Sequence, residues 1–197
     1  MHDDDRPDIR GLETEAYEQQ GYFTSAQART HRVSSQLLNH HARRGRYERV
    51  RRGLYRLQGF PHSDHDEMRE KWLAVGAEKA VLSHESALAL LELSDVIPDA
   101  VHLLVPRRQR GLRRPSGVVL HTRPDDAYVP TVWRDGLPLT APARTLVDTL
   151  DQLQSEQAAM AVRQALRRGL LTERQLTEEA GRRGNTRTVE AVLATSR

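Results

Sequence analysis

The sequence predicts an α+β protein: an N-terminal winged helix-turn-helix, followed by a mixed α/β domain with a small sheet and C-terminal helices. Three observations predict this class. Apolar residues recur at helical spacing in some stretches and alternate as in strands in others. Turn-forming residues cluster at 58–66 and divide the chain. The charge is segregated into blocks, although the net charge of the 197 residues is only +3.

Residues 10–58 predict the winged helix-turn-helix, in the order helix, helix, turn, helix and hairpin. Ser25 is a good N-cap for the second helix, and Ser34 with Ser35 can cap the third, because serine hydroxyls accept hydrogen bonds from free backbone N–H groups. Gly53 lies in a turn between two short, alternating, β-prone arms. The predicted helices and arms are 10–20, 26–31, 35–44, 47–50 and 54–57.

A tail, a linker and a second domain complete the predicted organisation. Residues 1–9 are acidic and predict a disordered tail, and residues 59–66 predict a linker. Residues 67–197 predict an α/β domain, in which Thr140 caps a helix with Pro142 in its first turn, where proline is favoured. Besides that helix, the predicted strands are 101–105, 118–121 and 137–139, and the predicted helices are 67–79, 84–93, 155–168, 173–181 and 186–194.

The block 29–56 carries nine arginines and one acid, a net charge of +8, and apolar residues run through it at structural spacing. On a helix over 35–44, Leu37, Leu38 and Ala42 can face inward, which turns the polar positions outward. Arginine pairs with guanine edges, and asparagine or glutamine pairs with adenine. We interpret the block as a DNA-reading helix followed by a charged wing. A polar helix on a basic surface and a protein-docking module fit the same pattern.

The predicted DNA contacts fall into three groups. The start of the second helix can hold a phosphate on free backbone N–H groups, the third helix offers its polar face to base edges, and the wing touches phosphates or the minor groove. Neutralising about five or six phosphates would give log K a slope of about −5 against log salt. The contacts are expected from Thr24, Ser25, Ser34, Ser35, Gln36, Asn39, His40, Arg43, Arg44, Arg46, Arg49, Arg51 and Arg52.

A second basic segment, 107–114, carries five arginines and no acid between two predicted strands. One interpretation is a solvated hairpin. The others are a second nucleic-acid contact and a dock for the acidic surface of a partner. The residues of this second basic contact are Arg107, Arg108, Arg110, Arg113 and Arg114.

The sequence predicts no catalytic, metal or cofactor site. The chain has no cysteine, which excludes disulfides, thiolate zinc sites and a cysteine nucleophile. Two histidines and two aspartates at 62–66 lack a recognised ligand spacing, and no Gly-rich phosphate loop with lysine occurs. Arg144 and Asp148, four residues apart, predict an ordinary ion pair. No apolar run is long enough for a membrane helix and no secretory signal is present, so a cytoplasmic protein is expected.

Five stretches carry a resemblance to a known family when they are read in order. They are 21–28 (GYFTSAQA), 51–57 (RRGLYRL), 82–91 (LSHESALALL), 101–106 (VHLLVP) and 136–148 (GLPLTAPARTLVD). The first two resemble the N-terminal winged helix of the AbiEi family, and the others resemble its C-terminal domain. Members of this family are antitoxins of type IV toxin–antitoxin systems.

The resemblance implies a bipartite, non-enzymatic antitoxin without a cofactor. Its N-terminal domain would bind double-stranded operator DNA and repress its own operon, and its C-terminal domain would counter a cognate nucleotidyltransferase toxin. Whether the toxin is bound, modified or kept from its target stays open. The operator of a repressor is expected to hold inverted repeats. The alternatives are a winged-helix regulator with a ligand-sensing or oligomerising C-terminal domain, and a truncated relative of endonuclease-like proteins, which the lack of an Asp…Glu-x-Lys constellation disfavours.

Overall fold

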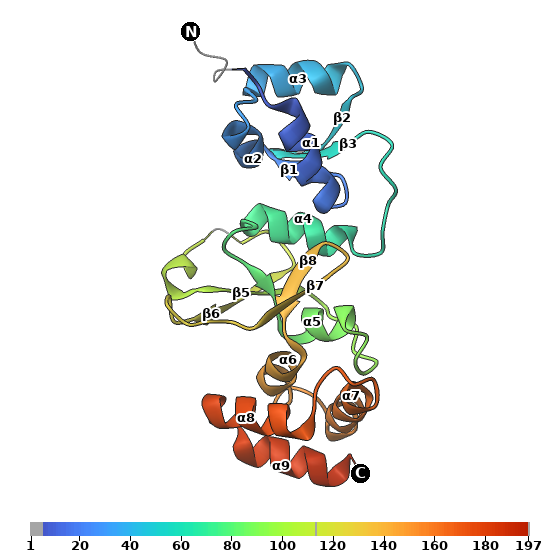
Figure 1. Ribbon diagram of the computed structural model, residues 1–197, viewed down its shortest axis with the longest axis vertical. Coiled ribbons are helices and arrows are strands. Elements are labelled where there is room, and N and C mark those ends of the chain that lie inside the picture. Colours follow the sequence, from blue (N-terminus) through green and yellow to red (C-terminus); the bar gives the residue numbers. More distant parts are fainter. Residues whose placement is uncertain (1–5, 113, 197) are drawn as a thin grey trace. The chain divides into compact units, whose positions relative to one another are not determined.

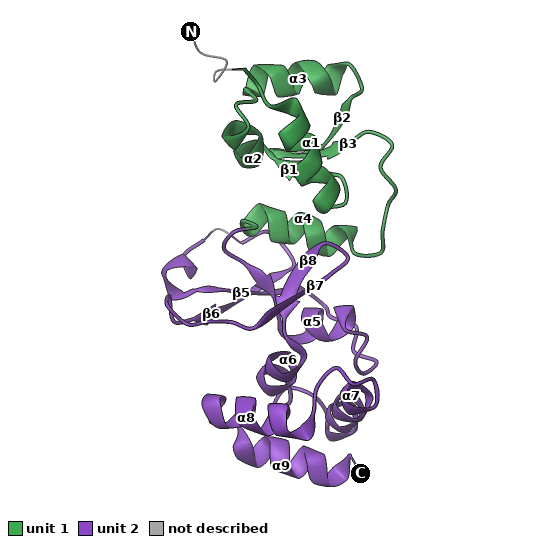
Figure 2. Ribbon diagram, viewed as in Figure 1, with its two compact units in different colours: residues 1–77 green, residues 78–197 purple. Residues whose placement is uncertain are grey.

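The computed structural model describes residues 6–112 and 114–196, and the chain forms two compact units, residues 1–77 and 78–197 (Figures 1 and 2). The predicted α+β class is confirmed, because each unit combines helices with a small sheet. Of the predicted tail, residues 1–5 lie outside the described residues. Asp8 belongs to the first helix as its N-cap: its carboxylate accepts a hydrogen bond from the Gly11 N–H at 2.9 Å.

The helices of the first unit follow the predicted order. The capping prediction at Ser25 is wrong, because Thr24 is the N-cap and forms a capping box with Gln27, which leaves Ser25 one residue inside the helix. Ser34 caps the next helix as predicted, accepting a hydrogen bond from the Leu37 N–H at 3.2 Å. The helices are α1 (Ile9–Glu18), α2 (Ser25–Thr30), α3 (Ser35–Arg43) and α4 (Asp66–Val75).

The sheet of the first unit confirms the predicted hairpin and adds a strand to it. The strands are β1 (Tyr22–Thr24), β2 (Tyr47–Arg51) and β3 (Leu54–Leu57), in the antiparallel order β1-β3-β2. Gly53 adopts a φ of +79° in the turn between β2 and β3, a conformation that glycine reaches without a steric penalty. The sequence did not predict β1, because three residues are too few to show alternation.

The core of the first unit fixes the hairpin against the helices. Phe23 of β1 meets Tyr47 of β2 edge-on, with ring centroids 5.0 Å apart, and stacks on Tyr55 of β3 at 5.6 Å. Aromatic pairs of this geometry add to the stabilisation that burial provides. The buried apolar residues of this core are Leu12, Ala16, Phe23, Ala28, Val33, Leu38, Tyr47, Tyr55 and Leu57.

Arg56 of β3 ties the predicted linker to the sheet. Its side chain is only 3% exposed and contacts the Asp66 carboxylate at 3.6 Å and the Pro61 carbonyl at 2.5 Å. It also contacts the His62 ring at 2.9 Å and lies over the Tyr22 ring, 5.0 Å from its centroid. Residues 61–66 are therefore held by a buried arginine.

The predicted start of the second domain, residue 67, falls within α4, and compactness places α4 in the first unit. This helix packs against β1 and β3. Glu70 of α4 accepts a hydrogen bond from the Tyr22 hydroxyl through its side chain, at 3.4 Å, and one from Arg51 through its backbone carbonyl. These contacts extend the first unit to residue 77.

The helices of the second unit lie close to their predicted ranges. The prediction that Thr140 caps the helix at 142 is wrong, because the N-cap is Ala141. The Thr140 hydroxyl is instead buried, 2.7 Å from the Thr145 hydroxyl. Pro142 occupies the first turn as predicted. The helices are α5 (His84–Leu90), η2 (Arg107–Gln109), α6 (Pro142–Thr149), α7 (Ser155–Arg167), α8 (Glu173–Arg183) and α9 (Thr186–Thr195).

The sheet of the second unit is mixed, with the order β6-β5-β4-β8-β7. Its strands are β4 (Val81–Leu82), β5 (Val101–Pro106), β6 (Val118–Arg123), β7 (Thr131–Arg134) and β8 (Leu137–Thr140). The sequence missed the short β4 and the exposed β7. The hairpin interpretation of the arginine segment is wrong, because β5 and β6 pair in parallel. After β5 the chain therefore has to cross back to the other end of the sheet before β6 begins, whereas a tight hairpin would join antiparallel strands at one end.

Candidate nucleic-acid interface

Helix α3 presents a continuous polar face. Leu38 is the buried residue of this helix, and Leu37 and Ala42 are partly covered, which matches the predicted inward positions. Val33, in the turn before α3, is part of the buried core, so the core holds the start of this helix. The exposed side chains of this segment are Ser34, Ser35, Gln36, Asn39, His40, Arg43 and Arg44.

Four of these exposed side chains carry the chemistry that reads base edges. Gln36, Asn39, His40 and Arg43 follow one another at the i, i+3, i+4 and i+7 positions of one helix face. Amide side chains match adenine, and the arginine fork matches guanine. These four residues, from which the sequence predicts base contacts, are exposed, and the His40 ring meets the His41 ring with centroids 5.7 Å apart.

At the start of α2, where the sequence predicts a phosphate site, two backbone donors are used within the protein. The Ser25 N–H donates to the Gly53 carbonyl at 2.9 Å, and the Gln27 N–H donates to the Thr24 hydroxyl at 3.1 Å. The Thr24 hydroxyl in turn donates to the Gln27 side chain at 3.0 Å. This helix end fixes the wing turn against α2 through the Ser25–Gly53 hydrogen bond.

The three wing arginines have different environments. Arg49 on β2 and Arg52 in the turn are exposed, with their side chains open to a phosphate. Arg51 is half-buried, and its guanidinium donates a hydrogen bond to the Glu70 carbonyl of α4. That hydrogen bond occupies Arg51 in the folded unit, so Arg49 and Arg52 are the more accessible of the three arginines.

Arg46, at the end of the helix-turn-helix, is paired with an acid. Its guanidinium donates to the Glu13 carboxylate at 2.8 Å, which raises the pKa of Arg46, and the Tyr47 hydroxyl donates to the same carboxylate oxygen at 3.2 Å. Burial raises the pKa of Tyr47 to about 12. Burial and the nearby Arg46 charge lower the pKa of His41. A phosphate would compete with Glu13 for Arg46.

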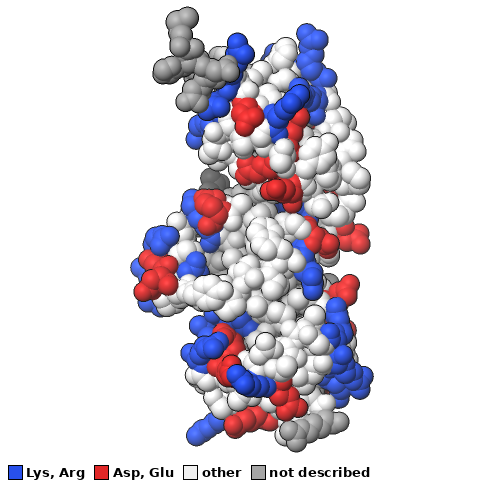
Figure 3. Space-filling view, viewed as in Figure 1, with Lys and Arg blue, Asp and Glu red and all other residues white. Residues whose placement is uncertain are grey.

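The second basic segment lies in the connection between the parallel strands β5 and β6. Arg107, Arg108 and Arg110 follow the carboxyl end of β5, whereas Arg114 lies four residues before Val118, the start of β6. All four arginines are exposed, and Arg113 lies outside the described residues. Figure 3, which shows one face of the molecule, shows acidic side chains interspersed among the basic ones on both units. On the face shown, acidic side chains therefore separate the basic ones.

Three histidines of the second unit meet although they are far apart in the sequence. The rings of His84 on α5 and His121 on β6 stack with centroids 3.4 Å apart, and His102 on β5 approaches His121 with 3.0 Å between ring nitrogens. Burial lowers the pKa of His84 to about 3 and that of His121 to about 4, so both rings are neutral at pH 7.

Sequence reasoning missed this histidine cluster, since no local spacing indicates it. The pairing of β5 with β6 and the packing of α5 on β5 bring the three rings together. Their arrangement is not that of a metal site: among the described residues, no group of three or more histidine or acidic side chains is placed to hold a metal ion.

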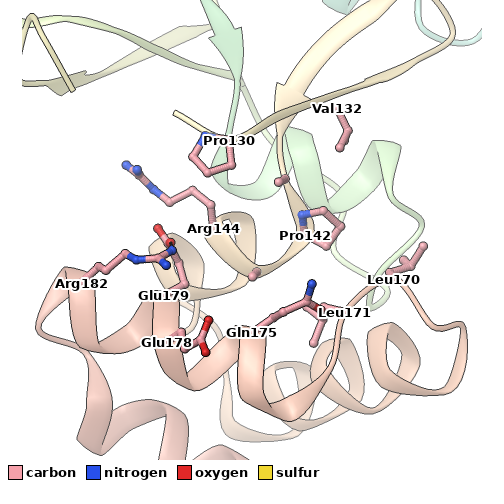
Figure 4. Close-up of a pocket in the computed structure, with 12 residues that line it drawn as sticks. Pro130, Val132, Pro142, Arg144, Leu170, Leu171, Gln175, Glu178, Glu179 and Arg182 are labelled. Carbon is pink, nitrogen blue, oxygen red and sulfur yellow. Dashed lines mark hydrogen bonds and ion pairs between the residues drawn. The ribbon is translucent and has the colours of Figure 1, made fainter. Parts of the chain in front are cut away.

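A pocket of about 430 Å³ opens beside α6 and α8 (Figure 4). The predicted Arg144–Asp148 ion pair is present, at 2.5 Å, with side chains 5% and 6% exposed. Arg144 lines the pocket, and so does Glu179, which pairs with Arg182 at 3.2 Å. Asp148 also pairs with Arg183 at 3.3 Å, so it holds two arginines and ties α6 to α8.

The comparisons with known proteins identify the family. Residues 12–58 match the family model described as "Transcriptional regulator, AbiEi antitoxin", and residues 79–192 match the model described as "AbiEi antitoxin C-terminal domain". The chain belongs to the AbiEi antitoxin family. The resemblance predicted from the five sequence stretches is therefore confirmed, and the two AbiEi models cover the two units separately.

The chain also has a similar protein among the solved structures. The AbiEi chain is similar to the RV2827C protein from Mycobacterium tuberculosis, with a TM-score of 0.42 and 18% identity over 95% of this chain and 80% of that one. No curated protein matches the chain. In the described part of the AbiEi chain, no helix has both the length and the apolar character needed to cross a membrane.

Proposed function

We propose that this chain is a DNA-binding autorepressor and antitoxin, which binds inverted repeats in its own operator and neutralises a cognate nucleotidyltransferase toxin. Its family is one of antitoxins and transcriptional regulators. The observation that carries DNA binding is the exposed face of α3 with Asn39 and Arg43, on a helix fixed by the core. Exposed Arg49 and Arg52 extend this face to the wing.

The test of DNA binding is fluorescence anisotropy with duplex DNA from upstream of the chain's own gene. Arg43→Ala removes a base-reading fork, and each good bidentate contact contributes about 1–3 kcal/mol of discrimination. We expect binding to this DNA to weaken by about 10- to 100-fold, and binding to unrelated duplex to change far less.

Arg167→Ala is the matched control, because this arginine is also exposed but lies at the end of α7. It should leave both affinities within about twofold of the wild type. Equal losses for Arg43→Ala and Arg167→Ala would refute the assignment of α3 as the reading helix.

The test of neutralisation is co-expression with the neighbouring gene. We expect that gene to be toxic alone and harmless with the full chain. An Arg43→Ala, Arg49→Ala double variant should lose repression of its promoter and keep neutralisation, because both substitutions lie in the first unit. A neighbouring gene that is harmless alone would refute the antitoxin proposal for this pair.

The pocket beside α6 favours a second candidate function, a winged-helix regulator that senses a small molecule. Pockets of about 300–1,000 Å³ are of the size that ligands occupy, and this one combines apolar walls with Arg144 and Gln175. The same co-expression experiment distinguishes the two functions. If the chain is a ligand-sensing regulator without antitoxin activity, it will not neutralise a toxic product of the neighbouring gene.

A further inference from the structure

Two loops meet at one edge of the sheet in the second unit. Because β5 and β6 are parallel, both leave the sheet at the same edge, with Pro106 paired to Arg123 at the last register position. The loops that follow are joined by a hydrogen bond from the Arg108 N–H to the Asp125 carboxylate, at 2.9 Å. Residues 107–110 and 124–128 therefore form one surface, here called the β5–β6 edge.

Arg123 shapes the β5–β6 edge from within. One nitrogen of its guanidinium donates to the backbone carbonyls of Pro124, Asp125 and Ala127, at 3.2, 3.3 and 2.9 Å. These three hydrogen bonds hold the loop up to the residue before Tyr128. The Tyr128 ring is 85% exposed, so a held loop presents a large aromatic side chain to solvent.

The charge of the β5–β6 edge is positive. Arg107, Arg108 and Arg110 are exposed, and Asp125 and Asp126 are its acids. Asp125 accepts the hydrogen bond from the Arg108 backbone, so that carboxylate fixes the loop in place. Three free guanidinium groups thus lie on the same joined loops as an exposed aromatic ring.

Arginines and an exposed aromatic ring on joined loops are features that bind single-stranded nucleic acid. A base without a partner strand stacks on the ring, and arginines hold its phosphates. We propose that the β5–β6 edge is a second nucleic-acid site, separate from the winged helix, which binds a single-stranded nucleic-acid segment with Tyr128 as the stacking platform.

The aromatic ring favours this ligand over the alternatives. A duplex keeps its bases stacked inside and offers no open base face to Tyr128. An acidic protein surface would be attracted to the arginines but would give the exposed ring no role. A single strand with unpaired bases uses both the ring and the guanidinium groups.

The test is fluorescence anisotropy of the full-length protein with a labelled oligouridine of about 12 nucleotides, a length suited to such sites. Tyr128→Ala should weaken binding at least about fivefold, because stacking one base on an aromatic side chain contributes this much or more. Tyr128→Phe, which keeps the ring, should bind as the wild type does. An Arg107→Gln, Arg110→Gln variant should lower the magnitude of the salt slope by about 1.4.

The controls separate this site from general charge and from the winged helix. Arg167→Gln with Arg187→Gln removes two exposed arginines elsewhere in the second unit and should leave oligouridine binding unchanged. Binding to upstream duplex DNA should also be unchanged by Tyr128→Ala. The proposal is overturned if Tyr128→Ala leaves oligouridine binding intact, if duplex binding falls equally, or if the control pair weakens RNA binding as much as the loop pair does.

Discussion

Arg56→Met tests the claim that a buried arginine holds residues 61–66 on the first unit. The substitution removes a charge that is 3% exposed and leaves the Asp66 carboxylate, 15% exposed, without its contact at 3.6 Å. Breaking a buried ion pair typically costs about 3–5 kcal/mol. Asp66 keeps its contacts with Arg69 at 3.3 Å and with His62 at 2.9 Å. We therefore expect the free energy of unfolding to fall by about 2–3 kcal/mol, at or below the low end of that range.

The assay is urea unfolding of the full-length protein, followed by circular dichroism for both units. A loss of this size would lower the midpoint of the first unit by about 1–2 M urea, for a slope typical of a small domain. Arg49→Met is the matched control: the same exchange on the exposed β2 should stay within about 0.5 kcal/mol of the wild type.

A double-mutant cycle with Asp66→Asn isolates the pair. Since the two side chains contact each other, the double variant should differ from the sum of the single variants by at least about 0.5 kcal/mol. Full additivity, or an Arg56→Met variant as stable as Arg49→Met, would refute the reasoning.

Three further predictions concern other contacts. Arg49→Ala should lower the magnitude of the salt slope of duplex DNA binding by about 0.9. Arg51→Ala should leave the slope unchanged, because Arg51 is bound to the Glu70 carbonyl. Equal slopes for the two variants would contradict this prediction. Thr24→Ala should cost about 1 kcal/mol in urea unfolding through loss of the α2 cap, and Ser25→Ala less than half as much. The buried His84 ring, with its pKa lowered to about 3, should show no titration by NMR between pH 5 and 8. Because the unfolded chain takes up that proton near pH 6.5, stability should fall as the pH drops from about 6.5 towards 3, and a His84→Asn variant should lose part of that dependence.

Most of the secondary structure was predictable, because its signals are local. The helices over 35–44 and 155–168 each show a periodic apolar face within a few turns, and the structure places α3 and α7 within one residue of them. The hairpin around Gly53 combines alternation with a turn residue. Elements that carry no such signal, such as the two-residue β4, were missed.

Predictions of contacts, unlike that of the α2 cap, depended on which partner a polar side chain finds. The cap of α2 was readable locally, because Thr24 followed three residues later by Gln27 is the capping-box pattern, which the choice of Ser25 overlooked. Arg49 and Arg51 lie on the same short strand, yet α4 reaches one of them and not the other. Such choices follow from packing between segments that are distant in the sequence.

The sequence by itself determined the two-part α+β organisation, the basic helix with its hairpin wing, and the family, because periodicity, charge blocks and motifs all lie in short stretches of sequence. The tertiary structure alone decided the direction of β6. Strand direction depends on pairing across the sheet, which local propensity does not encode. Parallel pairing replaces the expected hairpin, and it brings the loop that holds Tyr128 to the same end of the sheet as the loop that holds Arg107, Arg108 and Arg110.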